Sequence, residues 1–157
     1  MPITSCIWFN HNAVAAAHFY TNLFPNSELL SEVPSPGDNP STSQGEVLMV
    51  EVLLDGQRLT LLNGGPQFPP SEAFSLQYPC ESQESADYFY NALVADGGEV
   101  SQCGWLKDKF GISWQVYPAA MGDYLGGPDP EGAARAMAAM LQMQRIDLEA
   151  LRLAYLG

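Results

Sequence analysis

The chain has 157 residues, and 6 lysines and arginines against 18 aspartates and glutamates give it a formal charge of −12 at pH 7. Its length is that of one folded domain, and 46% hydrophobic residues exclude wholesale disorder. The acidic charge excludes nucleic acids and anionic membrane surfaces as partners, because both require clustered lysine and arginine. No apolar run reaches the roughly 20 residues that span a bilayer, and residues 1–5 do not resemble a signal peptide. We therefore expect a cytoplasmic protein.

The first predicted helix has a counterpart in the second half of the chain. The pattern Phe-Tyr-x-x-Leu at residues 19–23 recurs at residues 89–93. In both places apolar residues follow the spacing i, i+3, i+4, i+7 and i+8, which forms the buried face of an amphipathic helix. Asn12 and Ser82 stand where N-caps are expected. The repeat predicts two related structural units.

Strand-like segments surround each helix in the same order. Around the first helix they span residues 3–9, 28–33, 47–54 and 59–63, with a hairpin predicted by the Asp-Gly pair at residues 55–56. Around the second helix they span residues 73–80, 99–103, 105–107 and 112–117. Each half is thus predicted to be a β-α-β-β-β unit, the first at residues 1–65 and the second at 72–117, with a linker at 66–71. The turn at residues 107–109 is expected to be the exposed tip of a hairpin.

Residues 118–157 are predicted to form a helical appendix to these two units. Asp129 followed by Pro130 is typical of a helix start, and Asp147 is a second N-cap. Ile146 is positioned to pack on Leu151 as a hydrophobic staple. The first of these two short helices has an apolar face that we expect to be buried against the body or another subunit. This face consists of Met137, Met140 and Leu141.

The three cysteines do not indicate a disulfide framework or a structural zinc site. They are an odd number without C-x-x-C spacing, at positions 6, 80 and 103. Reduced, partly buried thiols are the expected state. Cys103 as a nucleophile would need a nearby base, and both histidines, His11 and His18, lie in the first half of the chain.

Several motifs resemble one protein family over nearly the whole chain. They lie at residues 8–9, 19–27, 62–65 and 103–116, the last reading CGWLKDKFGISWQV. The chain resembles the PhnB-like branch of the vicinal-oxygen-chelate (glyoxalase/bleomycin-resistance) superfamily, which is often labelled a 3-demethylubiquinone-9 3-methyltransferase domain. The resemblance implies an α+β fold of two β-α-β-β-β units whose curved mixed sheets surround a cavity, followed by the helical appendix, all in one domain at residues 1–157. It also implies a homodimer.

The superfamily's metal site is not expected in this chain. Metal-dependent members hold a divalent cation with His, Glu or Gln side chains from the first and last strands of each unit. The corresponding segments here contain no His, Asp or Glu, and only Gln115 stands near a ligand position. We therefore predict no metal and no cofactor. The methyltransferase label is interpreted as inherited, because no glycine-rich turn follows the first strand.

Polar-neutral and aromatic side chains remain as candidates to line a cavity. Strand alternation places Gln115 and Trp114 on opposite faces, so the whole set cannot face one space. Each member has an alternative role in the core or at a strand end. The predicted ligand-binding residues are Trp8, Asn63, Gln67, Gln77, Cys103, Trp105, Trp114 and Gln115.

Two functions follow from this set of residues. The first is a binding protein that holds a small hydrophobic or aromatic molecule without a metal, because apolar walls with a few amides are typical of small-molecule pockets. The second is a small-molecule enzyme of the same superfamily, with either an atypical metal site that uses Gln115 or metal-free acid/base chemistry. The sequence leaves the catalytic residues of such an enzyme, and the ligand itself, open.

Overall fold

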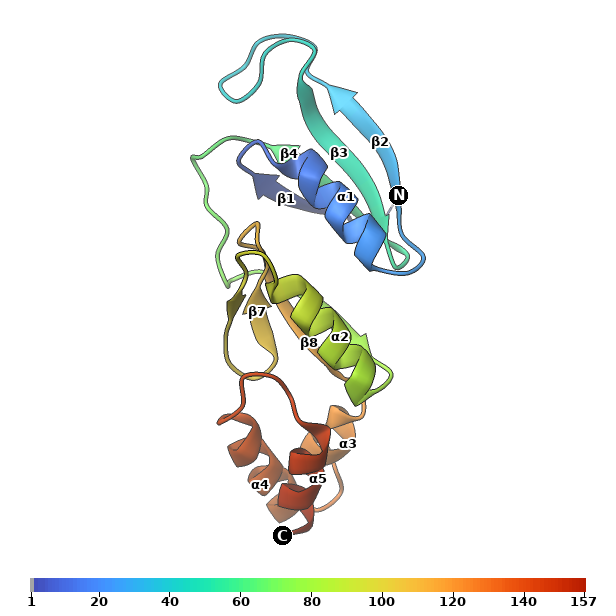
Figure 1. The fold of residues 1–157 in the computed structure, drawn as a ribbon, viewed down its shortest axis with the longest axis vertical. Coiled ribbons are helices and arrows are strands. Elements are labelled where there is room, and N and C mark those ends of the chain that lie inside the picture. The colour runs from blue at the N-terminus through green and yellow to red at the C-terminus, as the bar shows by residue number, and fades with distance from the viewer. Residues whose placement is uncertain (1) are drawn as a thin grey trace. The chain divides into compact units, whose positions relative to one another are not determined.

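The computed structural model describes residues 2–157, and the chain divides into unit 1 (Met1–Pro70) and unit 2 (Ser71–Gly157) (Figure 1). Each unit contains one mixed sheet of four strands. The predicted α+β class with two β-α-β-β-β repeats is confirmed. None of the helices within residues 2–157 combines the length and the hydropathy needed to cross a membrane.

Unit 1 places one helix across its sheet (Figure 1). Its elements are β1 (Ser5–Phe9), α1 (Ala13–Leu23), β2 (Glu28–Pro34), β3 (Val47–Leu54) and β4 (Gln57–Asn63). The sheet order is β1-β4-β3-β2, with β1 parallel to β4 and the other neighbours antiparallel. The predicted hairpin between β3 and β4 is confirmed, since Asp55 and Gly56 have φ angles of 43° and 85°, which a tight hairpin turn of this kind requires.

Unit 2 repeats this topology. Its elements are β5 (Leu76–Cys80), α2 (Gln83–Val94), β6 (Glu99–Val100), β7 (Trp105–Lys107) and β8 (Ser113–Pro118), in the sheet order β5-β8-β7-β6. β5 runs parallel to β8, as β1 does to β4. Two predicted strands are shorter than expected: β5 begins at Leu76, and β6 ends before Cys103, whose φ of 57° belongs to a turn.

The repeated apolar stripe is the buried side of both helices. Tyr20 of α1 and Tyr90 of α2 are both buried, together with the alanine four residues before each. The predicted cap at Ser82 is confirmed, because its hydroxyl accepts a hydrogen bond from the backbone N–H of Ser85. Asn12 does stand at the predicted N-cap position, and its backbone carbonyl accepts from the N–H of Ala16, but its side chain does not cap the helix. Its backbone (φ −116°, ψ 20°) is not extended as a capping residue requires, and its side chain makes no cap hydrogen bond.

The appendix contains three helices rather than the two predicted. They are α3 (Met121–Leu125), α4 (Pro130–Met140) and α5 (Leu148–Leu156). Asp129 and Asp147 cap α4 and α5 as predicted. The small core of the appendix is formed by Ala136, Ile146 and Leu151.

Within a single chain, only part of the methionine-rich face of α4 is buried. Met140 packs against the appendix core. Met137 is 43% exposed and Leu141 is 56% exposed, so neither is buried against the body of this chain. The appendix core takes its α4 contacts from Ala136 and Met140, which leaves Met137 on another side of the helix.

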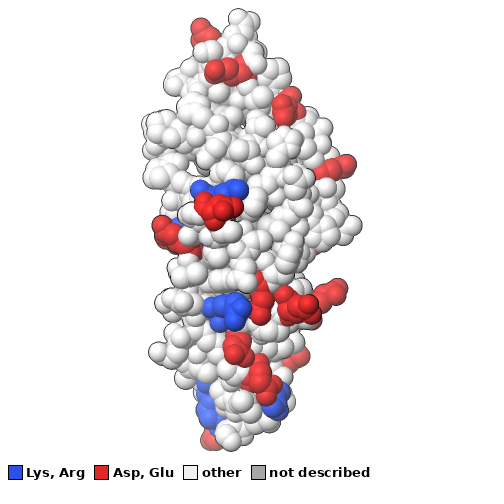
Figure 2. Space-filling view, in the orientation of Figure 1, with Lys and Arg blue, Asp and Glu red and all other residues white. Residues whose placement is uncertain are grey.

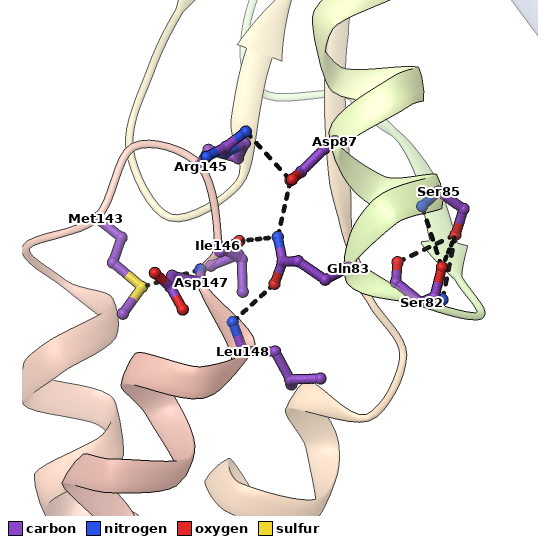
Figure 3. A network of polar contacts seen from close by, with 9 residues as sticks. All are labelled: Ser82, Gln83, Ser85, Asp87, Met143, Arg145, Ile146, Asp147 and Leu148. Carbon is purple, nitrogen blue, oxygen red and sulfur yellow. Dashed lines mark hydrogen bonds and ion pairs between the residues drawn. The ribbon is translucent and has the colours of Figure 1, made fainter.

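One glutamine holds the appendix to α2 (Figure 3). The Gln83 side-chain amide donates to the carbonyl of Ile146 at 2.8 Å and accepts from the backbone N–H of Leu148 at 2.8 Å. The same amide donates to Asp87, which also pairs with Arg145 at 3.3 Å. This network fixes the segment between α4 and α5, so it positions both helices on unit 2.

Candidate functional site

Each sheet has one face covered by the helix of its own repeat, α1 in unit 1 and α2 in unit 2. On the opposite face of the unit 2 sheet, Tyr117 packs against the core of the appendix. Successive strand residues point to opposite faces, so the register of the strands assigns each side chain to one face. In unit 1 the helix-covered face holds the core. We call the opposite face the helix-free face, and its two central rows consist of Trp8, Leu62, Met49 and Val33, and of Cys6, Thr60, Glu51 and Ser31.

Trp8 is the predicted site residue on the helix-free face of unit 1. Its indole Nε1 donates to the carbonyl oxygen of Gly65 at 2.9 Å, and its ring meets Phe68 edge-on with centroids 4.9 Å apart. A Cβ atom on Gly64 would lie 2.1 Å from a carbon of the indole, so only glycine fits there. The segment after β4 thus fixes the orientation of Trp8. Gln67, in the same segment, is exposed.

Three predicted site residues form a single row on the helix-free face of unit 2. Gln77 on β5 is paired with Gln115 on β8, which is paired with Trp105 on β7. Gln115 donates from Nε2 to the hydroxyl of Ser75 at 2.9 Å. Trp105 and Gln115 are half-buried and Gln77 is exposed. The row joins an indole to two amides at neighbouring strand positions.

Asn63 and Trp114 lie on the helix-covered faces instead. The Asn63 carbonyl oxygen accepts from the backbone N–H of Ala13 at 3.0 Å, and its amide donates to the carbonyl of Val47 at 2.9 Å. Asn63 therefore satisfies the start of α1, which Asn12 was expected to do. Trp114 is buried at 3% exposure. The structure thus separates these two residues from the rows on the helix-free faces.

Asp108 is a buried acid that the sequence interpretation missed. The expected exposed tip is wrong for this residue, which is only 2% exposed. Its Oδ1 accepts from the backbone N–H groups of Phe110 and Ile112, and its Oδ2 accepts from the indole N–H of Trp114 at 2.9 Å. The spacing of Asp108 before Gly111, whose φ is 84°, is a turn signal that could have indicated this role.

Cys103 lies against the appendix. Its backbone N–H donates to the carbonyl of Met143 at 2.8 Å, and its thiol lies 3.5 Å from the carbonyl of Met140. His11 and His18 are both exposed. Burial raises the pKa of the Cys80 thiol to about 11, so this thiol is protonated at neutral pH. The thiols of Cys80 and Cys103 thus have structural roles.

Glu51 is a second residue that the sequence interpretation passed over, because only first and last strands were searched for acids. It stands on β3, in the helix-free face of unit 1, and is half-buried. The hydroxyl of Ser31 donates to its carboxylate at 3.1 Å. Among residues 2–157, no three side chains of His, Cys, Asp or Glu are grouped so that they could hold a metal ion.

The next row of the same face is more polar and more exposed. Glu28 and Arg58 stand on either side of Leu53 in register. A hollow of about 300 Å³ lies at this end of the sheet and is lined by Asn26, Ser27, Glu28 and Leu53. The hollow therefore continues the helix-free face beyond Glu51.

Solved structures share this fold of two repeated β-α-β-β-β units. A PhnB protein from Bacillus cereus, described with the 3-demethylubiquinone-9 3-methyltransferase label, is 30% identical over 73% of this chain and 97% of its own, with a TM-score of 0.65. A protein from Pseudomonas aeruginosa is 22% identical over 73% of this chain and 94% of its own, with a TM-score of 0.58. The fosfomycin resistance protein FosX from Listeria monocytogenes, solved with Mn(II) and sulfate, is 13% identical over 80% of this chain and 95% of its own, with a TM-score of 0.54.

The sequence pattern of one family matches residues 1–117. The chain belongs to this family, which is described as 3-demethylubiquinone-9 3-methyltransferase. The family resemblance read from the sequence is thereby confirmed. No protein of curated function matches the chain. The match ends at residue 117, so the appendix lies outside it.

Proposed function

We propose that the chain binds a small hydrophobic or aromatic molecule on the helix-free faces of its sheets, without a metal ion. The observation that supports this most is the chemistry of those faces. Half-buried indoles stand there beside apolar or amide side chains, as Trp8 does beside Leu62 and Trp105 beside Gln115. Aromatic side chains supply apolar contact area at little entropic cost, and a few amides orient a ligand.

The donor atoms available do not fit the metal site of the metal-dependent members. Such a site needs imidazole or carboxylate ligands for Mn, Fe, Ni or Zn. On the helix-free faces β1 offers Cys6 and Trp8, and β8 offers Gln115 as a neutral oxygen donor. Methyl transfer is not part of the proposal either, because each sheet is a mixed four-stranded one without a glycine-rich turn after its first strand.

Calorimetric titration with 1-naphthylmethanol, a neutral aromatic probe, tests this function. We expect saturable binding to protein treated with EDTA, weakened about tenfold or more by Trp8→Leu or Trp105→Leu, because each change removes one aromatic contact surface. Tyr88→Leu is the matched control, since Tyr88 lies on α2 and is 62% exposed. Equal weakening by the control, or binding only after Mn(II) is added, would contradict the proposal. Conversion of the probe to a product would favour the enzyme alternative.

We further propose that the chain forms a homodimer through α4. Met137 and Leu141 are one helical turn apart and both are exposed. Burying them in a second copy would remove this apolar surface from water. The family match ends at residue 117 and does not include α4, so this contact would be made by the appendix.

A further inference from the structure

The helix-free face of unit 1 combines an apolar row with one negative charge. Trp8, Leu62 and Met49 stand in register across three neighbouring strands. Glu51 follows Met49 by two residues on β3, so its side chain lies on the same face. With strands about 4.8 Å apart and a rise of about 3.4 Å per residue, two strand spacings and two residues along the strand separate Trp8 from Glu51 by roughly 12 Å. A flat molecule lying over Leu62 and Met49 would reach both.

The Glu51 carboxylate has a neutral partner only. Ser31 donates one hydrogen bond to it, and no ion pair to Glu51 occurs within residues 2–157. Arg58 is the basic side chain on this face. It stands in the next row and is exposed, with Glu28 two strands away in that row. A half-buried carboxylate without a cationic partner is stabilised by a cation that arrives with a ligand.

The charge of unit 1 adds to this local field. Residues 1–70 contain one basic side chain, Arg58, against six acids. Figure 2 shows each unit from the side on which its helix lies, α1 or α2, where acidic side chains also outnumber basic ones. A negative potential concentrates cations at the surface and repels anions. The indole of Trp8 supplies aromatic contact area for the ring of such a ligand.

We propose that unit 1 binds a small aromatic cation, such as an aromatic amine, with its ring over Leu62 and Met49 beside Trp8 and its ammonium group at Glu51. This proposal rests on the proposed function and names its ligand class. The sulfate-like or phosphate-like anions that a basic pocket would take are disfavoured at this face. Glu51 acts as the counter-ion that selects the charge of the ligand.

The test compares three probes that share one ring system and differ in charge. They are 1-naphthylmethylammonium, 1-naphthylmethanol and 1-naphthylacetate, titrated by calorimetry at low ionic strength. We expect the ammonium to bind about tenfold tighter than the alcohol, and the acetate to bind more weakly than the alcohol. Glu51→Gln should remove the advantage of the ammonium over the alcohol.

Glu32→Gln is the matched control. Glu32 lies on β2, pairs with Val50 and is exposed. Its substitution therefore removes the same charge from the same unit, but from the other side of the sheet. We expect the preference for the ammonium to survive this change. The NMR resonances of the indole N–H groups distinguish binding in unit 1 from binding in unit 2. In wild-type protein, the ammonium should shift the resonance of Trp8.

Each outcome decides between the two proposals. If the ammonium and the alcohol bind equally, or if Glu32→Gln abolishes the preference as fully as Glu51→Gln does, the cation site is overturned while the proposed function stands. If none of the three probes binds, both are overturned. A preference for the ammonium that depends on Glu51 alone supports the site.

Discussion

At the scale of single residues, buried polar side chains connect segments that the sequence does not show to be neighbours. Asn63 ends β4 and satisfies the start of α1, and Asp108 joins its own turn to the indole of Trp114. Both residues have sequence surroundings that resemble ordinary turns or strand ends. Their partners are set by tertiary packing, so sequence patterns could place these residues but not predict their roles.

The Asp108 network predicts a large loss of stability. Asp108→Ala removes the acceptor of three N–H groups, and two of them, those of Ile112 and the Trp114 indole, then remain buried without this partner. We expect the free energy of unfolding, measured with urea, to fall by about 3 kcal/mol. Asp123→Ala, at an exposed residue, should change it by less than about 0.5 kcal/mol. Equal effects of the two substitutions would contradict this role.

Cys80 predicts a dependence of stability on alkaline pH. Burial raises the pKa of its thiol from 9.0 to about 11 in the folded protein. The unfolded thiol therefore releases its proton first, so this part of the stability is complete below pH 9 and is lost as the pH rises to 11. Over that range wild-type protein should lose about 2 kcal/mol more than Cys80→Ala does. If the free energies of unfolding of the two proteins, measured with urea, changed with pH by the same amount, this prediction would be refuted.

At the scale of elements, periodicity predicted the repeated helices and most of the strands. α1 and α2 are long and amphipathic, so their pattern is clear. α3 was missed because its five residues, one of them Gly122, are too short to show a period. The position of Glu51 on the helix-free face depends on the register of β3, which became known only from its pairing with β2 and β4.

The contact between α2 and the appendix predicts a specific loosening. Gln83→Ala removes hydrogen bonds to the backbone of Ile146 and Leu148. We expect unfolding to become easier by about 1–2 kcal/mol and amide hydrogen exchange over residues 143–151 to accelerate. Gln142→Ala is the control, because this glutamine is exposed. Unchanged exchange in Gln83→Ala would show that other contacts, such as the hydrogen bond from the Cys103 N–H to the Met143 carbonyl, hold this segment.

At the scale of the whole molecule, charge and apolar surface act in opposite directions. A formal charge of −12 opposes association, whereas the exposed Met137 and Leu141 favour it. The organisation of residues 1–157 as one domain stays a prediction. The ligand could not be predicted beyond its class, because the sequence shows which residue types are present but not which of them face the same side of a sheet.

The proposed homodimer predicts a change of mass on substitution in α4. Met137→Glu with Leu141→Glu should convert a dimer to a monomer in light scattering, because charge is placed in the apolar contact. Ala138→Glu adds a charge at a neighbouring exposed position of the same helix and should leave the dimer intact. A monomeric wild-type protein would rule out this interface.

Metal-free ligand binding on the helix-free faces is tested most directly by the three indole N–H resonances. Trp8 and Trp105 stand on those faces, whereas Trp114 is buried on a helix-covered face and serves as an internal control. During titration of EDTA-treated protein with 1-naphthylmethanol, we expect the resonances of Trp8 or Trp105 to shift saturably while that of Trp114 stays in place. No shift without Mn(II), or a shift of Trp114 alone, would contradict the account.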